Sequence, residues 1–527
     1  MGYDILIRGG TVYDGSGKAP IMADVAIADG RIVHIGETSE QAATVIDANG
    51  LAVAPGFIDI HSHSDYTLLI DPRAMSAIAQ GVTLEVIGNC GFGCAPIVDP
   101  RLAANAIYGF DNSIPLTWQG VGGYLEKLEA ARPAVNVMTL MPNGQLRLAT
   151  LGMSERPASP DETARMCGLL RDGLAEGAIG YSIGLEYPTE AGASEAELTA
   201  LAREAGRAGK MFATHTRDRA EGAAAAVDEV IRIARNAEVK LQVSHLIPRC
   251  GHEGSLRCVD AVDEARARGQ DIAFDMHTRL YGTTMLSTLL PLWSLSDGSA
   301  GVRGHLASAE SRARIKAYAS LIGSVGDWDN VILLDIPGRA DVSRLTLGEI
   351  GRRQGRDPHD CALDILADEA ETLQRPMVLL TVYDEAMQKV AFAHPLCMPG
   401  SDATDLATDG PLAGKMFHGA YTWAAWFWRA LVREWRLLTP EEAIHRLTGM
   451  PAKILGLSDR GAIRVGARAD IAVFSARDFG EAGTTFEPSQ LAHGMHHVVV
   501  NGVATLSNGA LTGARAGQVL RKSQATA

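Results

Sequence analysis

Through the middle of the chain, short apolar runs alternate with longer stretches in which apolar residues recur at helical spacing. This alternation is typical of parallel βαβ units, in which each buried strand is followed by a helix. We expect helices at 160–176, 195–208, 219–236 and 258–269. We expect strands at 52–60, 82–88, 135–141, 178–184, 211–215, 240–245, 271–276 and 396–401. Eight such strands predict an α/β fold, a TIM-like (β/α)8 barrel.

The interval between the seventh and eighth predicted strands is far longer than an ordinary connection, at about 120 residues. It must hold an insertion, which we place at about 283–393. Barrel enzymes carry their chemistry at the C-terminal ends of the strands, so an insertion over that face would serve as a lid.

The two ends of the chain differ from the middle, because both consist of short β-rich runs separated by turns. Asp29-Gly30 near the start and Asn501-Gly502 near the end are dipeptides that mark tight turns. We therefore expect both termini to build one small β-sandwich domain from residues 1–54 and 456–527. The barrel, with its insertion, would occupy residues 55–455.

Bulk composition supports a folded enzyme-sized protein and narrows its partners. The 527 residues are 46% apolar and 21% charged, with a formal net charge of −14. A chain of this length suits a large barrel plus a smaller unit. The acidic balance and the lack of any Lys/Arg run argue against a nucleic-acid partner, which requires positive charge to neutralise phosphates.

The sequence also predicts a cytoplasmic protein that does not cross a membrane. Seven scattered cysteines in a long chain do not resemble a disulfide framework and fit reduced thiols. The N-terminus lacks the basic and apolar regions of a signal peptide. No uncharged apolar run reaches the roughly 18 residues that a membrane helix needs. The richest apolar stretch, Trp423 to Trp435, is interpreted as a buried or interface helix. The sequence leaves open whether the chain forms a homo-oligomer.

Metal-type side chains stand at the ends of five predicted strands. His61 and His63 are two residues apart, so on a strand their side chains point the same way. A lone His-x-His pair is weak support, and a single buried cysteine is usually only a small apolar residue. Their joint occurrence at five strand ends favours a zinc site, since imidazole, thiolate and carboxylate are the usual zinc ligands. The candidate ligands are His61, His63, Cys90, His215, His245 and Asp402.

Several motifs carry a resemblance to known enzymes. Residues 55–63, Pro-Gly-Phe-Ile-Asp-Ile-His-Ser-His, resemble the first-strand motif of the amidohydrolase superfamily, and residues 459–471 resemble its closing segment. Within that superfamily, four motifs resemble the D-aminoacylase, or N-acyl-D-amino-acid deacylase, family: Gly88-Asn89-Cys90-Gly91, Gly184-Leu185-Glu186-Tyr187-Pro188, Thr214-His215-Thr216-Arg217 and Ser244-His245. This resemblance implies a zinc-dependent amidohydrolase.

By the same resemblance, Cys90, His215 and His245 would hold a tight zinc, with His61, His63 and Asp402 as a second, weaker site. Dihydroorotase- and hydantoinase-type relatives instead bridge two metals with a carboxylated lysine at the end of strand four, where this chain has no lysine. Glu186 remains open as a further ligand, as does the number of metals in the working enzyme.

The resemblance implies hydrolysis of a small linear amide, an N-acyl-D-amino acid or a related N-acyl compound. Metal-activated water would attack the carbonyl, with Asp402 as general base and acid. One alternative is an amidohydrolase that acts on a cyclic amide, a carbamate or a xenobiotic amide. Another is a non-catalytic barrel used for assembly, which predicts lost ligands. The acyl group and the D/L preference stay open.

The chain departs from the family where the substrate should bind. The family's lysine two residues after the strand-six histidine is replaced by Ile247, with Arg249 nearby. After strand seven, Asp275 is followed by Met-His-Thr-Arg rather than a Tyr-Pro-Tyr run, and Lys415 stands near the place of the family's arginine. The candidate substrate contacts are Tyr187, Arg217, Arg249, His277 and Lys415.

Overall fold

The computed structural model, which describes residues 2–521, contains a barrel of parallel strands. One sheet has the order β6-β7-β8 and another the order β17-β13-β12-β11-β10-β9. Only Leu140 separates β8 from β9, so together these strands fill eight positions. The strands are β6 (Phe57–Asp59), β7 (Val82–Ile87), β8 (Asn136–Thr139), β9 (Met141–Pro142), β10 (Gly180–Gly184), β11 (Met211–His215), β12 (Lys240–Val243), β13 (Ile272–His277) and β17 (Cys397–Gly400). All eight predicted strand positions are confirmed.

The barrel closes through the segments that follow its first and last strands. The Asp402 amide donates to the His61 carbonyl at 2.8 Å, and the His63 amide donates to the Ala403 carbonyl at 2.8 Å. Ser62 and Ala403 form a parallel bridge between these two segments. This pairing carries the ends of β6 and β17 to the same rim of the barrel.

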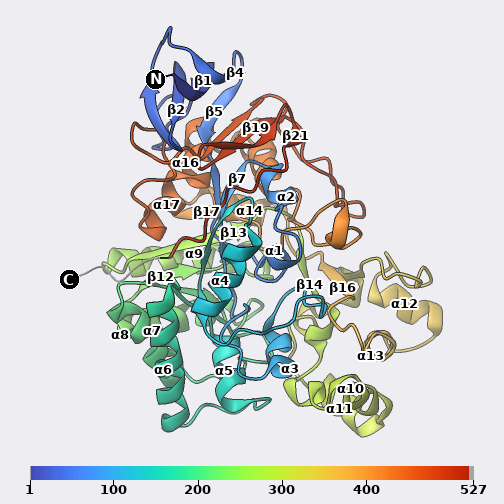
Figure 1. Cartoon of the computed structure of the whole chain (residues 1–527). Helices are drawn as coiled ribbons and strands as arrows, with labels where there is room; N and C mark the ends of the chain where they lie inside the picture. Colours follow the sequence, from blue (N-terminus) through green and yellow to red (C-terminus); the bar gives the residue numbers. More distant parts are fainter. Residues whose placement is uncertain (1, 522–527) are drawn as a thin grey trace.

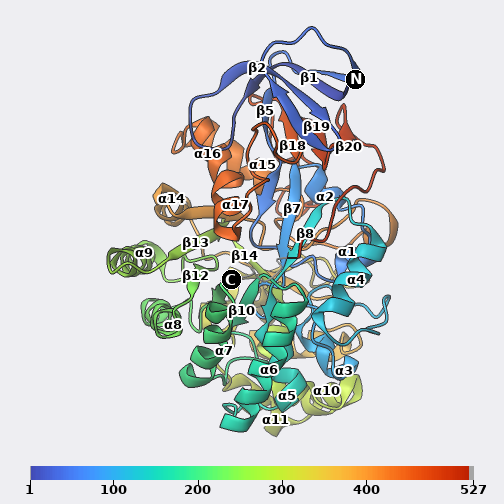
Figure 2. The ribbon, with the colours of Figure 1, turned by 60° about the vertical axis from the view of Figure 1, so that its left-hand side comes forward.

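Helices cover the outside of the barrel (Figure 2). Apolar side chains such as Ile58, Val86, Met138 and Ala213 form a buried cluster among its strands. Local sequence sets the helix starts. Helix α6 (Pro160–Glu176) begins with Pro160 after a capping box, in which Ser159 and Glu162 satisfy each other's backbone amides. The other surrounding helices include α4 (Val121–Ala131), α5 (Asn143–Leu151), α7 (Glu195–Arg207), α8 (Ala223–Ala237), α9 (Gly251–Ala267), α14 (Glu385–Ala393), α16 (Pro440–Leu447) and α17 (Gly449–Leu455). The predicted helix at 423–435 is α15 (Trp423–Phe427) followed by a π-helix, η7 (Trp428–Glu434).

Between β13 and β17 the chain leaves the barrel and builds its own small layer. Three short strands form an antiparallel sheet of order β14-β16-β15, which has a buried apolar cluster shared with the neighbouring helices. This segment lies to one side of the barrel (Figure 1). Its elements are β14 (Gly282–Met285), β15 (Val331–Leu333), β16 (Met377–Leu380), α10 (Gly298–Ala307), α11 (Ala309–Lys316), α12 (Leu347–Gln354) and α13 (Pro358–Asp368).

Strands from both ends of the chain pair in one nine-stranded sheet at the end of the molecule where the N-terminus lies (Figure 1). Its order is β21-β20-β19-β18-β5-β1-β2-β3, with β4 on β1. The strands are β1 (Tyr3–Val12), β2 (Ile21–Ala28), β3 (Arg31–Ile35), β4 (Ala42–Asp47), β5 (Ala52–Pro55), β18 (Ile471–Phe474), β19 (Met495–Val500), β20 (Val503–Ser507) and β21 (Ala510–Leu511). Within residues 2–521, no helix has the length and apolar character needed to cross a membrane.

Candidate metal centre

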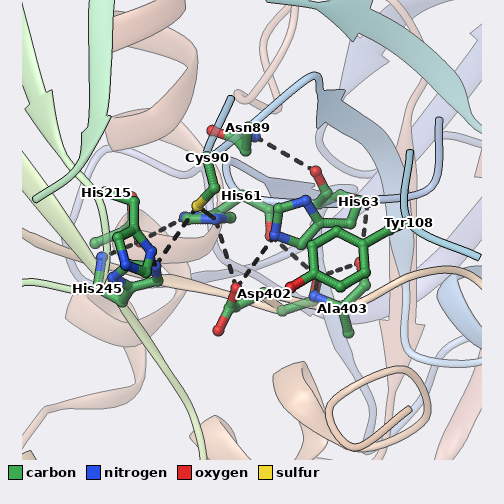
Figure 3. Close-up of polar contacts among 12 residues, drawn as sticks. His61, His63, Asn89, Cys90, Tyr108, His215, His245, Asp402 and Ala403 are labelled. Carbon is green, nitrogen blue, oxygen red and sulfur yellow. Dashed lines mark hydrogen bonds and ion pairs between the residues drawn. The ribbon is translucent and has the colours of Figure 1, made fainter. Parts of the chain in front are cut away.

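The six candidate ligands meet at the C-terminal rim of the barrel. They follow or end five different strands of the barrel, which brings residues far apart in sequence together. His61 and His63 follow β6, Cys90 follows β7, His215 ends β11, His245 follows β12 and Asp402 follows β17. Figure 3 shows Cys90 and His61 in the middle, with His215 and His245 on one side and His63 on the other.

The ligand atoms form two overlapping groups that could each hold a metal ion. One contains Cys90, His215 and His245, and the other contains His61, His63, Cys90 and Asp402. Within each group the donor atoms all lie within 4.8 Å of one another. The Cys90 Sγ is 3.6 Å from the His245 Nε2 and 3.2 Å from the His61 Nε2, so this sulfur lies between the two groups.

The loop that presents Cys90 depends on glycine. Gly88 and Gly91 have φ values of 79° and 73°, a backbone region that residues with a side chain rarely adopt. A Cβ on Gly88 would lie 2.4 Å from the Leu140 carbonyl oxygen. The Asn89 side chain donates to the Val86 carbonyl at 2.9 Å and closes the turn. The sequence Gly-Asn-Cys-Gly therefore folds into a tight turn that holds the thiol at the rim.

Three of the candidate ligands have a left-handed backbone that non-glycine residues seldom adopt. Cys90, His245 and Asp402 have φ values of 52°, 33° and 46°. Such conformations cost on the order of 1–3 kcal/mol each and concentrate at functional sites, where surrounding contacts hold them in place. The structure thus uses strained backbone at one ligand from each of three different strand ends.

A buried carboxyl group behind the Cys90 loop gives a pH-dependent prediction. Burial raises the pKa of Glu190 to about 7, so the unfolded chain loses this proton at lower pH than the folded chain. The contribution of Glu190 to the free energy of unfolding is therefore fully present below the ordinary glutamate pKa and is lost as the pH rises through about 7.

We expect the stability of Glu190→Gln relative to wild type to increase by up to about 3 kcal/mol as the pH rises from 4.5 to 8, measured by denaturant unfolding. Glu126→Gln, at an exposed position of α4, is the control. Parallel pH curves for Glu190→Gln and wild type would contradict the expectation.

Carboxylates hold two of the candidate histidines from behind. The Asp275 Oδ1 is 3.0 Å from the His61 Nδ1 and accepts the His245 backbone amide at 2.8 Å. The Glu186 Oε2 is 2.8 Å from the His215 Nε2. Metal-binding histidines generally donate their second ring N–H to such a partner, which fixes the ring and its tautomer. The geometry therefore leaves the His61 Nε2 and the His215 Nδ1 for a metal.

The electrostatics of the cluster suit a divalent cation. Burial lowers the pKa of His215 to about 4 and that of His245 well below its usual value, which favours the neutral imidazole that binds metal. For His61, burial again favours the neutral ring, but the negative charges of Cys90 and Asp275 outweigh it and raise its pKa. Burial would raise the pKa of Asp402, but the hydrogen bond with His63 and neighbouring positive charges lower it well below the usual range. Burial raises the pKa of the Cys90 thiol, so zinc binding would release its proton. A cysteine, imidazoles and an ionised carboxylate make a donor set that fits zinc.

The Glu186–His215 pair can be tested by its effect on metal affinity. Glu186→Gln should weaken binding of the tight zinc by about 10–100-fold, since it removes the charge that orients and polarises His215. Competition against a chelating dye measures this affinity. Glu229→Gln serves as the control, because Glu229 lies on α8, binds Arg217 and forms no ion pair with the cluster histidines among the described residues. Unchanged zinc affinity in Glu186→Gln would show that the pair does not support the metal.

Two of the predicted substrate contacts lie beside the cluster. The Tyr187 ring centroid is 4.9 Å from that of His215, and the Tyr187 hydroxyl is 3.4 Å from the Tyr108 hydroxyl. His277 ends β13, is 1% exposed, and neither of its ring nitrogens has a hydrogen-bond partner among the described residues. A buried polar ring with two unpaired nitrogens is suited to bind a ligand.

The three predicted cationic contacts are engaged elsewhere. Arg217 pairs with Glu229 at 2.9 Å and donates to the carbonyls of Ala191 and Ala193. These contacts tie Arg217 to α8 and the loop after β10 rather than to the cluster. Lys415 pairs with Asp111 at 2.6 Å and is partly exposed. Each of these two charges is paired with an acidic side chain, and the predicted substrate contacts of Arg217 and Lys415 stay predictions.

Arg249 is close to the cluster and binds Glu186 there, and its predicted contact with the substrate stays a prediction. Its guanidinium makes two bonds to the Glu186 carboxylate, one of 3.1 Å from Nη1 to Oε2. The same carboxylate binds His215, so Arg249 stands behind a candidate ligand. Glu186, which the sequence left open as a ligand, belongs to neither metal group among the described residues.

Sequence reasoning missed Asp275, Arg279 and Tyr108. Asp275 holds two cluster histidines, and Arg279 forms an ion pair of 3.0 Å with Asp402. The Tyr108 ring centroid lies 4.7 Å from that of His63. Asp275 carried a usable signal, because it lies near the end of strand seven, where barrel chemistry gathers. Arg279 and Tyr108 lie in loops and gave no such signal.

The chain was compared with known protein families and relatives. The chain matches the amidohydrolase family over residues 44–289 and 347–505. It is 32% identical to N-acyl-D-glutamate deacylase of Alcaligenes xylosoxydans xylosoxydans, over 98% of this chain and 96% of that protein.

Solved structures also match nearly the whole length of the chain. The crystal structure of N-acyl-D-glutamate deacylase from Bordetella bronchiseptica contains zinc and a phosphonate inhibitor that mimics the tetrahedral intermediate of the reaction. It matches with a TM-score of 0.81 at 30% identity, over 99% of this chain and 100% of that chain. A D-aminoacylase with a binuclear metal centre, described by one-metal activation and second-metal attenuation, matches with a TM-score of 0.80 at 30% identity over 99% and 100% of the two chains.

Proposed function

The chain belongs to the amidohydrolase family, and from this premise we propose that it is a zinc-dependent hydrolase of a linear amide, an N-acyl-D-amino acid or a related N-acyl compound. The observation that carries the proposal is the pair of metal-type groups at the barrel rim that share Cys90. The relatives at 30–32% identity, whose names are deacylases, support the reaction class.

Cys90, His215 and His245 would hold the tight zinc, and His61, His63 and Asp402 would form the weaker site. Zinc there would polarise the amide carbonyl and make a water molecule more acidic. The proposal thus includes one tight zinc site and a second, weaker one. Support for a second site comes from the Cys90 sulfur, which lies within reach of both groups, and from the binuclear centre of the related D-aminoacylase.

The chain's own residues would bind the substrate and move the proton. The Asp402 Oδ1 lies 3.3 Å from the His63 Nε2 and 3.6 Å from the His61 Nε2. From there this carboxylate would accept a proton from the attacking water and return it to the leaving nitrogen. His277 and Tyr187 would contact the substrate, because both lie beside the cluster and neither ring nitrogen of His277 has a hydrogen-bond partner within residues 2–521.

Hydrolysis assays with zinc analysis test this function. We expect the purified protein to contain zinc and to cleave N-acetyl-D-methionine faster than its L-isomer. Released methionine, measured by amine derivatisation, gives the rate, and elemental analysis gives zinc per chain. A protein with neither zinc nor activity would contradict the proposal and favour a non-catalytic barrel.

A second candidate is hydrolysis of an amide without a free carboxylate, such as a cyclic amide, a carbamate or a xenobiotic amide. One observation favours it: Arg217, Arg249 and Lys415 are each bound to an acidic side chain. Zinc-containing protein that cleaves neither isomer of N-acetylmethionine, but cleaves its N-methylamide, would select this candidate.

We also propose that residues 1–54 and 456–527, of which residue 1 and residues 522–527 lie outside the described part of the chain, form one β-sandwich domain, with residues 55–455 as the catalytic barrel and about 283–393 as its lid. The two ends share a sheet and a separate apolar cluster that includes Ile7, Val25, Ile471 and Val499. A core of its own is what a distinct domain requires.

A further inference from the structure

Arg279 reaches from the loop after β13 to the turn that presents Asp402. Its Nη2 donates to the Asp402 Oδ2 at 3.0 Å and to the Asp402 carbonyl at 3.0 Å, and its Nη1 donates to the Ser401 carbonyl. One guanidinium thus binds both the carboxylate and the backbone of the same turn. The planar, fixed donors of an arginine can bind a carboxylate and nearby carbonyls at the same time, which a single point charge does less well.

The two carboxylate oxygens of Asp402 have different partners. Oδ2 accepts the guanidinium, whereas Oδ1 faces the His61 Nε2 at 3.6 Å and the His63 Nε2 at 3.3 Å. A carboxylate that is free to rotate would present either oxygen to the cluster. With Oδ2 held, Oδ1 alone remains for a proton or a metal ion.

The residues around Arg279 bury it and hold it in this position. It is 3% exposed, and its own carbonyl accepts the Gln388 side chain of α14 at 2.7 Å. Gly419 lies against the guanidinium, and a Cβ there would be 2.5 Å from the Arg279 Nη1. The absence of a side chain at 419 therefore leaves the space that the guanidinium occupies.

The backbone contacts of Arg279 bear on the strain of the Asp402 turn. Asp402 has a φ of 46°, and its amide donates to the His61 carbonyl at 2.8 Å. Arg279 adds bonds to the carbonyls on both sides of that residue, at Ser401 and Asp402. Strained residues persist only where surrounding contacts fix them. Without the guanidinium, two of these restraints would be lost.

We propose that Arg279 is a positioning residue for Asp402: it holds Oδ2 and the turn, so that Oδ1 faces His61 and His63. This role rests on the proposed function, in which Asp402 moves the proton. It differs from the role of a cation that binds a substrate carboxylate, because both Nη atoms of Arg279 are bound to the Asp402 turn, while its buried Nε has no hydrogen-bond partner among the described residues.

The two roles predict different kinetics. Loss of a positioning residue lowers kcat for every substrate, since the reacting geometry is disturbed, whereas loss of a substrate-binding cation raises KM for charged substrates only. We would compare N-acetyl-D-methionine with its uncharged N-methylamide in wild type, Arg279→Lys and Arg279→Ala. Arg147→Lys is the matched control, because Arg147 is also buried and paired with a carboxylate, Glu197, away from the cluster.

For Arg279→Ala we expect kcat to fall by about a hundredfold on whichever substrate the wild type cleaves, with KM changed by less than about threefold. Arg279→Lys should fall less, and added guanidinium ion should restore part of the activity of Arg279→Ala. The tight zinc should remain in both variants, and Arg147→Lys should keep wild-type kcat. A rise in KM confined to the charged substrate, or an unchanged kcat, would overturn the proposal.

Metal binding provides a readout that does not depend on turnover. Chelator competition should show that Arg279→Ala weakens the second zinc, which would use Asp402, at least about tenfold more than the first. If wild type cleaves no amide, the proposed function fails, and this measurement still decides whether Arg279 positions Asp402. Equal affinity of wild type and both folded variants for the second zinc would then contradict the proposal.

Discussion

Asp402→Asn should lower kcat about a thousandfold while the zinc at Cys90, His215 and His245 stays bound. Asparagine keeps the size of the side chain but cannot accept a proton from water. In the wild-type protein the pKa of Asp402 is well below its usual range, because the hydrogen bond with His63 and nearby positive charges outweigh the effect of burial. The carboxylate is therefore ionised and oriented toward the cluster at neutral pH.

Steady-state kinetics together with elemental analysis measure both halves of this expectation. Asp409→Asn is the control, because Asp409 follows the same strand, β17, but is exposed and paired with Arg73. It should keep wild-type activity. Turnover by Asp402→Asn close to that of wild type would remove Asp402 from the proton-transfer role.

Cys90→Ala should abolish tight zinc binding and, with it, activity. The Cys90 sulfur belongs to both metal groups, so its removal leaves two imidazoles in one group and takes the shared atom from the other. We expect the affinity for the first zinc to fall by more than the roughly 10–100-fold that loss of an outer partner costs. Chelator competition and zinc content of the purified variant measure this change.

Cys94→Ala offers a close control for Cys90→Ala. Cys94 is also buried and lies four residues further along the chain, but it belongs to neither metal group among the described residues. This variant should retain about one tight zinc and wild-type turnover. If Cys90→Ala bound the first zinc as tightly as Cys94→Ala does, the assignment of the tight site would be wrong.

Much of the barrel could be predicted from the sequence, because each strand is marked by a pattern of a few neighbouring residues. Each buried parallel strand is a short apolar run, and the metal-type residues follow these runs at fixed places. His215 and His245 could therefore be placed at neighbouring strand ends without knowledge of the rest. Helix α9 was harder: the sequence predicted a start at 258, but the helix begins at Gly251. Burial of Gly254 and Ser255 outweighs their low helix propensity.

The partners of the ligands could not be predicted, because they depend on which side chains meet across the barrel. Arg249 was predicted to contact the substrate, yet it binds Glu186, which in turn binds His215. Asp402 and Arg279 are 123 residues apart and meet only because β13 and β17 are neighbours. Charge alone identifies such residues as candidates, whereas three-dimensional contacts decide whether the charge is free or already paired.

Zinc titration of metal-free protein shows whether one zinc, held by Cys90, His215 and His245, is required for amide hydrolysis. After removal of metal with a chelator, wild type should be inactive on N-acetyl-D-methionine, and activity should rise in proportion to zinc until about one equivalent per chain is bound. Full activity of the metal-free protein, or no activity at any zinc content on this substrate and its N-methylamide, would contradict the account.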